Sequence, residues 1–448
     1  METNCPPQFL AIVVLAGLIF FLAPRSWVLP AFLIFSVFTG MTFQVYFLNL
    51  NFYSVRVFLL LAWLRILVRR ENKGVQWLPM DKGLIAFACA MVLVETLRRG
   101  LPGLIYAVAN SFYDTLGIYF LCRTLIRERK DVFQAVAWLG VVCAVLAGFM
   151  TAERLTRHNW LAPLGATTSW VTARDGKLRC QATFLHAVLA GTFGAVLLPL
   201  FVVSWTQGRR MKLLAVVGCI ASTLITVSAG SSGPLMTYAA GVFGLLMWPL
   251  RGQMRRVRWI LLIALTSLHL IMNAPVWALI ARVSSITGGS GWHRFNILDT
   301  FINHIGDWWL VGTETTSDWG WLTEDVANQY CIVAKHGGLL AVVLFIRLLV
   351  IGFREVGIQR ANASNDRPTE VLVWAFGCVL LSHLATFFAT SYFDQTIVLW
   401  YLTLALIASL RLVTSAEVQE GLESFESTEN AGAEVENYNE GSPLAGPA

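Results

Sequence analysis

The chain has 448 residues, of which 56% are hydrophobic and only 13% are charged, and its formal net charge is +6. Soluble domains carry about 25% charged residues, so this composition excludes an ordinary water-soluble domain and indicates a polytopic membrane protein. The small positive charge lies in short loops, which argues against nucleic acid as a partner.

Apolar runs recur along the chain from its first residues to residue 412. A helix that crosses a bilayer needs roughly 20 mostly apolar residues, and continuous apolar runs favour helices. We therefore predict an all-α integral membrane protein with about 12–13 transmembrane helices. The runs lie near 9–23, 28–48, 54–68, 83–97, 103–122, 132–150, 181–204, 212–229, 234–250, 258–280, 331–353, 371–390 and 395–412.

Basic clusters follow every second apolar run, and the positive-inside rule places such clusters in the cytoplasm. The alternate loops, near 151–180, 228–233 and 281–330, are then extracytoplasmic, and 281–330 is one large loop of this kind. The basic clusters are Arg69–Lys73, Arg123–Lys130, Arg209–Lys212, Arg251–Arg258 and Arg354–Arg367.

Three parts of the chain differ in composition. Residues 1–180 hold the N-terminal transmembrane helices and a basic outer loop, and residues 181–414 hold a transmembrane core with the loop 281–330. Residues 415–448 contain eight glutamates and no lysine or arginine, so we expect a disordered, acidic cytoplasmic tail. A tail of this kind suits contact with partner proteins of a biosynthetic complex.

The two larger outer loops have opposite charge. The 151–180 loop has five basic and two acidic residues, among them Arg174 and Arg179, whereas the 281–330 loop has two basic and six acidic residues. One interpretation is simple attraction between the loops. The other is a division of labour, in which arginines bind a diphosphate bidentately and carboxylates accept hydrogen bonds from sugar hydroxyls or act as a base.

A helix with an arginine in its first turn is predicted within the large loop. Residues 287–291 form a flexible Gly-rich break, and apolar residues then recur at helical spacing. Arg294 would combine its guanidinium with free helix N–H groups, both suited to phosphate, or would contact lipid headgroups. The apolar positions are Phe295, Leu298, Phe301, Ile302 and Ile305.

The segment Ser228–Pro234 is rich in small residues and lies between two apolar runs. Pro234 suits the first position of a helix, with Gly233 or Ser232 before it as the cap. The positive end of that helix would face the outer loops and could bind an anion near Ser231 and Ser232. The alternative is a turn whose small residues serve only close packing.

No pattern in the chain indicates a metal or another cofactor. The seven histidines form no HxxH or HExxH motif, and the eight cysteines form no CxxC motif. We therefore expect neither a metal site nor a cofactor.

Four segments in order resemble the O-antigen ligase and O-antigen polymerase family of bacterial membrane glycosyltransferases. They are the arginine-led Arg179–His186, the serine–glycine turn Ser228–Pro234, the segment Gly291–Gly312 with Gly-Trp-His-Arg and Trp-Leu-Val-Gly, and Asp325–Gly338 with its asparagine. The resemblance covers roughly residues 175–350.

This resemblance implies transfer of a glycan from an undecaprenyl-diphosphate carrier to an acceptor sugar at the periplasmic face of the bacterial inner membrane. Such a reaction serves O-antigen or exopolysaccharide biosynthesis and needs neither metal nor nucleotide sugar. The family's diphosphate-binding arginines correspond to Arg179 and Arg294. The family often has a histidine where Ala327 stands and an arginine where Ser232 stands, and the first departure favours a polymerase-like member.

Because of that departure, the general base has to come from elsewhere, and several residues are open as candidates. The predicted catalytic residues are Arg294, Asp325, Glu314 and His336, with Glu324 as a further carboxylate. The predicted substrate-binding residues are Arg179, Arg174, His293, Asn328, Ser231 and Ser232.

Two other classes of function remain as alternatives. A transporter or flippase for a polyprenyl-linked or polysaccharide substrate would use ionisable residues within spans, of which Arg56, Glu95 and Asp114 are the candidates. A membrane anchor for other biosynthetic enzymes would act through the acidic tail.

Overall fold

The computed structural model describes residues 3–47, 50–72, 76–282 and 291–414, and most of them are helical. The predicted all-α class is therefore confirmed in its coarse form, with two short hairpins added. Residues 287–290 of the predicted break and the tail 415–448 lie outside the described residues. The division of the chain at residue 180 stays a prediction.

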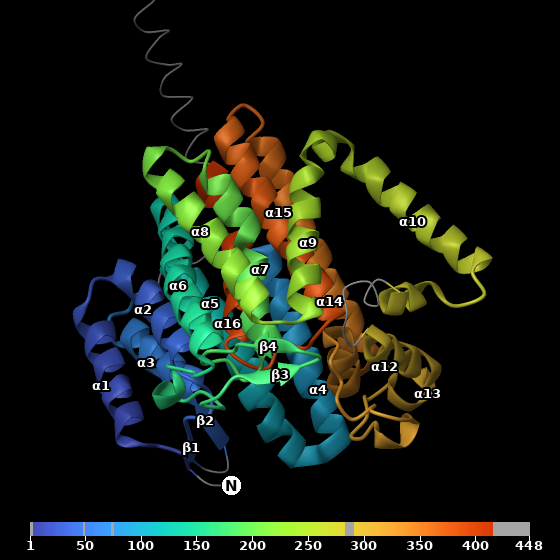
Figure 1. The fold of residues 1–448 in the computed structure, drawn as a ribbon, viewed down its shortest axis with the longest axis horizontal. Coiled ribbons are helices and arrows are strands. Elements are labelled where there is room, and N and C mark those ends of the chain that lie inside the picture. Colours follow the sequence, from blue (N-terminus) through green and yellow to red (C-terminus); the bar gives the residue numbers. More distant parts are fainter. Residues whose placement is uncertain (1–2, 48–49, 73–75, 283–290, 415–448) are drawn as a thin grey trace, which may run out of the picture.

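Twelve of the described helices form a bundle, and the other elements lie at its ends or side (Figure 1). The bundle helices are α1 (Pro7–Leu22), α2 (Arg25–Phe38), α3 (Ser54–Val68), α4 (Pro79–Ala107), α5 (Thr115–Leu125), α6 (Arg129–Thr156), α7 (Ala187–Ser204), α8 (Arg209–Ser228), α9 (Ser232–Leu246), α14 (Gln329–Asn362), α15 (Arg367–Phe387) and α16 (Thr396–Ala408).

The remaining elements are shorter, apart from α10. They are β1 (Gln44–Phe47), β2 (Leu50–Tyr53), the π-helix η1 (Val108–Asp114), η2 (Ala162–Leu164), β3 (Thr172–Arg174), β4 (Lys177–Arg179), η3 (Trp248–Gln253), α10 (Met254–Ile271), η4 (Val276–Ala278), α12 (Gly291–Asn303), α13 (Ile305–Trp308) and η5 (Ser317–Trp319). Each strand pair is an antiparallel hairpin.

Four described helices, namely α6, α7, α8 and α15, are long and apolar enough to cross a membrane. A fifth candidate arises if α9 and the segment Trp248–Ile271, which meet at 70°, form one broken span. Several predicted runs are divided between shorter helices, and α4 breaks at Gly100, whose φ is +65°. The apolar helices are compatible with a membrane protein, and the predicted count of about 12–13 spans stays a prediction.

Helix α7 forms the centre of the bundle because small residues let its neighbours approach closely. A Cβ atom added at Gly191 would lie 2.5 Å from Ala229 Cβ, and one at Gly194 would lie 2.8 Å from Ile225 Cβ. Ser222 Oγ of α8 donates to the Gly194 carbonyl oxygen at 2.8 Å. Close backbone approach through small residues is the usual basis of helix packing in membranes.

The two ends of the bundle differ in what they carry. Both hairpins, α12 and α13 lie at one end, and the turns between α7 and α8, α9 and α10, and α14 and α15 lie at the other (Figure 1). At the latter end Gln207 donates to the Pro368 carbonyl oxygen at 2.7 Å, and Arg251 pairs with Glu370 at 3.1 Å. The loops that carry Arg209 and Arg251 thus lie at one end, and which end is the outer one stays a prediction.

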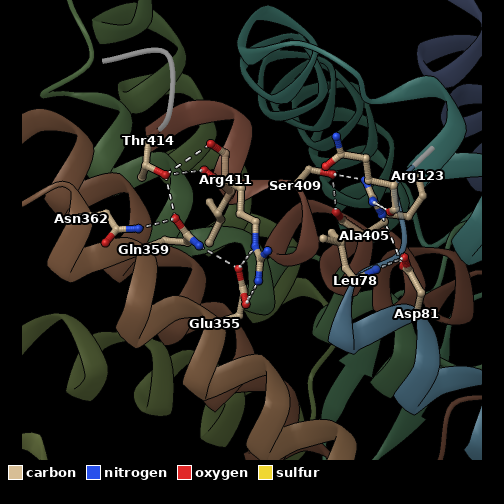
Figure 2. A network of polar contacts seen from close by, with 12 residues as sticks. Leu78, Asp81, Arg123, Glu355, Gln359, Asn362, Ala405, Ser409, Arg411 and Thr414 are labelled. Atoms are coloured by element: carbon tan, nitrogen blue, oxygen red, sulfur yellow. Dashed lines mark hydrogen bonds and ion pairs between the residues drawn. The ribbon is translucent and has the colours of Figure 1, made fainter. Parts of the chain in front are cut away.

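A polar network joins the last described residues to the bundle, at the end that carries the turn between α14 and α15 (Figure 2). Arg411 Nε lies 2.7 Å from Glu355 Oε1, and Thr414 Oγ1 donates to Gln359 Oε1 at 2.7 Å. Ser409 Oγ accepts from Arg123 at 3.2 Å. The end of the described chain is therefore bound to α14 and α5.

Asp394, in the link between α15 and α16, fixes a segment at the opposite end. Its carboxylate accepts from Leu185 N at 3.3 Å and from Thr396 N at 2.9 Å, and it is 1% exposed. Burial raises the pKa of Asp394 to about 7. The carboxyl therefore binds its proton more tightly in the folded than in the unfolded protein.

This shift predicts a pH dependence of stability. The free energy of unfolding should fall by about 2–3 kcal/mol between pH 5 and pH 8, because the folded protein loses a proton that the unfolded chain has already lost. In Asp394→Asn, which stays neutral, this part of the slope should vanish. Melting temperatures of both proteins across that range test the prediction, and an identical slope in the variant would contradict it.

Candidate functional site

The turn between α8 and α9 presents an uncapped helix end. Gly230 has φ +56°, Ser231 is the N-cap of α9, and its side chain makes no capping hydrogen bond. The fixed φ of proline predicted Pro234 as the first residue of this helix. The helix begins at Ser232 instead, so Pro234 is its third residue. Within the described part of the chain, no side chain caps this N-terminus, which carries the positive end of the helix dipole.

Arg294 lies against this helix end. As predicted, it is in the first turn of α12, but its guanidinium reaches α9 rather than the N–H groups of α12. Arg294 Nη1 lies 3.4 Å from Ser232 Oγ, and a Cβ added at Gly233 would lie 3.3 Å from Nη2. Any larger residue at 233 would therefore press on the guanidinium.

The Arg294 side chain is a buried cation that has no counter-ion among the described residues. The residue is 3% exposed, its Nε has no hydrogen-bond partner, and no carboxylate of the described residues pairs with it. Burial lowers the pKa of Arg294 to about 10, so the group is charged at neutral pH. Because a buried unpaired charge is costly, this geometry is suited to an anionic ligand.

The buried face of α12 differs from the predicted one. Arg294, Ile297 and Phe301 point inward, and of the five predicted apolar positions only Phe301 is buried. Ile297 and Phe301 form a small separate core with Trp308, Val326 and residues of α14. The packing of Ile297 and Phe301 therefore turns the Arg294 side of α12, and not the side of Phe295, toward the protein.

Arg179 approaches the same turn from the β3–β4 hairpin. The hairpin turns at Asp175 and Gly176, both with positive φ, as two-residue hairpin loops require. A Cβ atom added at Gly230 would lie 3.6 Å from Arg179 Cγ. Cys180 N donates to the Ser228 carbonyl oxygen at 3.0 Å. The Arg179 stem and the Arg294 guanidinium thus lie beside positions 230 and 233 of one turn.

His186 adds a second helix N-terminus to the site. It is the N-cap of α7, its Nδ1 accepts from Val188 N at 3.3 Å, and its Nε2 lies 3.4 Å from Arg179 Nη2. Arg179 and the N-terminus of α7 thus meet at the His186 ring. Sequence reasoning treated His186 only as part of a helix-opening segment.

Asp325 and His293 lie at the exposed side of this cluster. His293 Nε2 is 4.0 Å from Asp325 Oδ2, and the Asp325 side chain is 85% exposed. The charge of Asp325 also acts on His186. Asp325 is thus an exposed carboxylate beside His293.

Two other predicted binding residues have mainly structural contacts. Arg174 is exposed at the end of β3 and lies 3.9 Å from Asp175, although its charge acts on Arg179. Asn328 is the N-cap of α14, and its Oδ1 accepts from Tyr330 N and Cys331 N. The Nδ2 of Asn328 is buried and has no partner in the described residues.

Glu314 and His336 form a different cluster with α4. Arg99 Nε donates to Glu314 Oε1 at 2.9 Å, and His336 Nδ1 lies 3.7 Å from Glu95 Oε2. None of the contacts described for this pair involves Arg179, Arg294 or the 228–234 turn. The structure therefore divides the four predicted catalytic residues between two places.

A buried carboxylate that sequence reasoning did not select holds the Arg179 segment. Glu153, 2% exposed near the end of α6, accepts from Gln181 N at 3.1 Å and from Ala182 N at 2.9 Å. Ala182 has a positive φ of 51°, so the segment is strained as well as anchored. A glutamate in the last turn of an apolar helix gives no sequence signal of this role.

Arg56 and Asp114, two of the three candidates for a transporter or flippase, are paired with each other. Asp114 accepts from Arg56 Nε at 2.8 Å, from Arg56 Nη2 at 2.7 Å and from Tyr53 Oη at 2.6 Å. Both carboxylate oxygens thus have charged or strong donors, as in a structural ion pair. A relay through Asp114 would have to break these bonds.

Arg56→Met should therefore destabilise the protein by about 3–5 kcal/mol, because it leaves the Asp114 charge buried and unpaired. The double variant Arg56→Met/Asp114→Leu should recover most of this loss. Thermal unfolding of the three proteins measures both effects. Equal stability of Arg56→Met and the unchanged protein would show that the pair is not structural.

Comparison with known proteins found no match among family models and none among curated proteins. The site is therefore interpreted from its own chemistry and from the four segments described above.

Proposed function

We propose that the chain is a membrane glycosyltransferase of the inner membrane. It polymerises or transfers a glycan from an undecaprenyl-diphosphate carrier to an acceptor sugar in the biosynthesis of O-antigen or exopolysaccharide. In this proposal the chain has about 12–13 spans, and the end that carries α12 and the hairpins is periplasmic. The reaction uses no metal.

One observation supports this proposal most strongly, the buried and unpaired Arg294 guanidinium at the open N-terminus of α9. A diphosphate carries several negative charges, accepts bidentate hydrogen bonds from arginine and suits helix N–H groups. Arg179, whose Cγ lies beside Gly230 of the same turn, would supply a second guanidinium. A single carboxylate or chloride would use only part of this arrangement.

The chemistry follows from this placement. An acceptor hydroxyl attacks the anomeric carbon, the bond from that carbon to the diphosphate oxygen breaks, and the diphosphate leaves with the electron pair. Arg294, Arg179 and the α9 N-terminus stabilise the charge that develops on the leaving oxygen. Asp325, beside His293, takes the hydroxyl proton.

The test is a reconstitution of the purified protein in liposomes with an undecaprenyl-diphosphate-linked oligosaccharide. Longer glycans on a gel, together with free undecaprenyl diphosphate, are the expected products. Movement of the lipid between leaflets without any new glycosidic bond would replace this proposal with the flippase alternative.

A further inference from the structure

A cavity of about 360 Å³ lies between α4, η1, α14 and α16. It arises where α4 passes into the seven-residue π-helix η1, whose Asn110 and Ser111 line the space. π-Helical segments are rare and occur frequently at functional sites. The proposed reaction does not use this cavity.

One part of the cavity wall is aromatic and another is polar. Tyr106, Phe393 and Trp400 provide ring faces or edges, and Glu95, Gln329 and His336 provide polar atoms. Binding sites for small organic ligands combine an apolar lining with a few placed polar groups in this way. Flat aromatic surfaces suit the C–H faces of sugar rings.

Two polar atoms in the wall lack hydrogen bonds. Glu95 is 2% exposed, and its Oε1 has no hydrogen-bond donor, although Arg99 Nε lies 3.4 Å away. His336 Nδ1 is also buried; it makes no hydrogen bond of normal length among the described residues, and Glu95 Oε2 lies 3.7 Å away. Since buried polar atoms are nearly always hydrogen-bonded, these two point to hydroxyl groups of a ligand.

The charges around the cavity are compensated within the protein, unlike the charge of Arg294. Glu95 Oε2 accepts from Arg98, Arg99 pairs with Glu314, and Asp114 pairs with Arg56. The cavity wall therefore has no net charge that would favour binding of an ion. The cavity therefore suits a neutral ring with several hydroxyl groups and is unsuited to a second diphosphate.

From this geometry we infer that the cavity binds a neutral sugar residue, with Glu95 and His336 as the groups that hydrogen-bond its hydroxyls. The cavity lies near the arginine site, because Ala389 touches the Gly233 position beside Arg294 and Ser391 lines the cavity. Its use as the acceptor subsite rests on the proposed function, whereas the binding itself does not.

The test is saturation-transfer NMR on the full chain in lipid nanodiscs, which contain no sugar detergent. The probes are the methyl glycosides of glucose, galactose, mannose, N-acetylglucosamine and rhamnose. We expect saturation transfer to at least one of them. Glu95→Gln, which keeps the shape but removes the charged acceptor, should weaken binding about tenfold.

Two further variants locate the binding. Ser111→Trp fills the cavity and should abolish the signal. Glu128→Gln also removes a carboxylate, but Glu128 is half-exposed, pairs with Lys130 and does not line the cavity, so the signal should be unchanged. Melting temperatures establish whether each variant is folded. If Ser111→Trp does not fold, the binding measured for Glu95→Gln decides the test.

The inference is overturned if the unchanged protein transfers saturation to none of the five sugars, or if Glu95→Gln binds them equally well. Its failure is separable from that of the proposed function. A protein that binds a sugar in this cavity but forms no glycosidic bond refutes only the glycosyltransferase. A protein that extends glycans but binds no sugar here refutes only the cavity site.

Discussion

Arg294→Met is expected to abolish glycan transfer and, in the same protein, to raise the melting temperature. The guanidinium is buried and has no counter-ion in the part of the chain that the structure describes, and burial lowers its pKa to about 10. Its removal should therefore stabilise the ligand-free protein by about 1–3 kcal/mol. The loss of a preorganised group that stabilises developing charge should lower the rate by at least about 100-fold.

The two readouts are glycan length on a gel and thermal unfolding of the purified protein. Arg255→Met is the matched control, because Arg255 is exposed at the start of α10. It should change neither quantity. A variant of Arg294 that is both inactive and less stable would indicate that the arginine stabilises the fold and is not a binding group for an anion.

Glu153→Gln is expected to have the second largest effect. Its carboxylate accepts two backbone hydrogen bonds, from Gln181 and Ala182, in the segment that carries Arg179 and His186. A glutamine amide can accept only one of them and presents its NH₂ group to the other donor. We expect a loss of about 2–3 kcal/mol of stability and a lower rate of transfer.

Glu128→Gln is the control for this prediction. Glu128 lies at the other end of α6, where it is half-exposed and paired with Lys130, and exposed pairs contribute little. Glu128→Gln should have the same melting temperature and the same rate of glycan transfer as the unchanged protein. If Glu153→Gln transfers glycan at the full rate, the carboxylate does not position Arg179 for the reaction.

Local features of the site were predictable from the sequence. The first turn of α12 at Arg294 and the turn before α9 both follow from short-range signals, namely helical periodicity and small residues beside a proline. The Asp175–Gly176 pair is an equally clear hairpin signal, and it could have predicted β3 and β4.

Long-range features were not predictable. Arg294 meets α9 and not its own helix end, because packing of Ile297 and Phe301 sets the rotation of α12. Likewise, His336 meets Glu95 only because α4 and α14 pack together. The contacts of Asp394 with Leu185 and of Glu153 with Gln181 have no local pattern, since these partners lie 209 and 28 residues away.

Binding of geranylgeranyl diphosphate, a short polyprenyl diphosphate, tests the central proposal most directly. Titration calorimetry of the purified protein should show binding that weakens at least about tenfold in Arg294→Met, and geranylgeraniol without phosphate should not bind measurably. The ligand should also raise the melting temperature of the unchanged protein but not that of the variant. Equal affinity of both proteins for the diphosphate would contradict the proposed site.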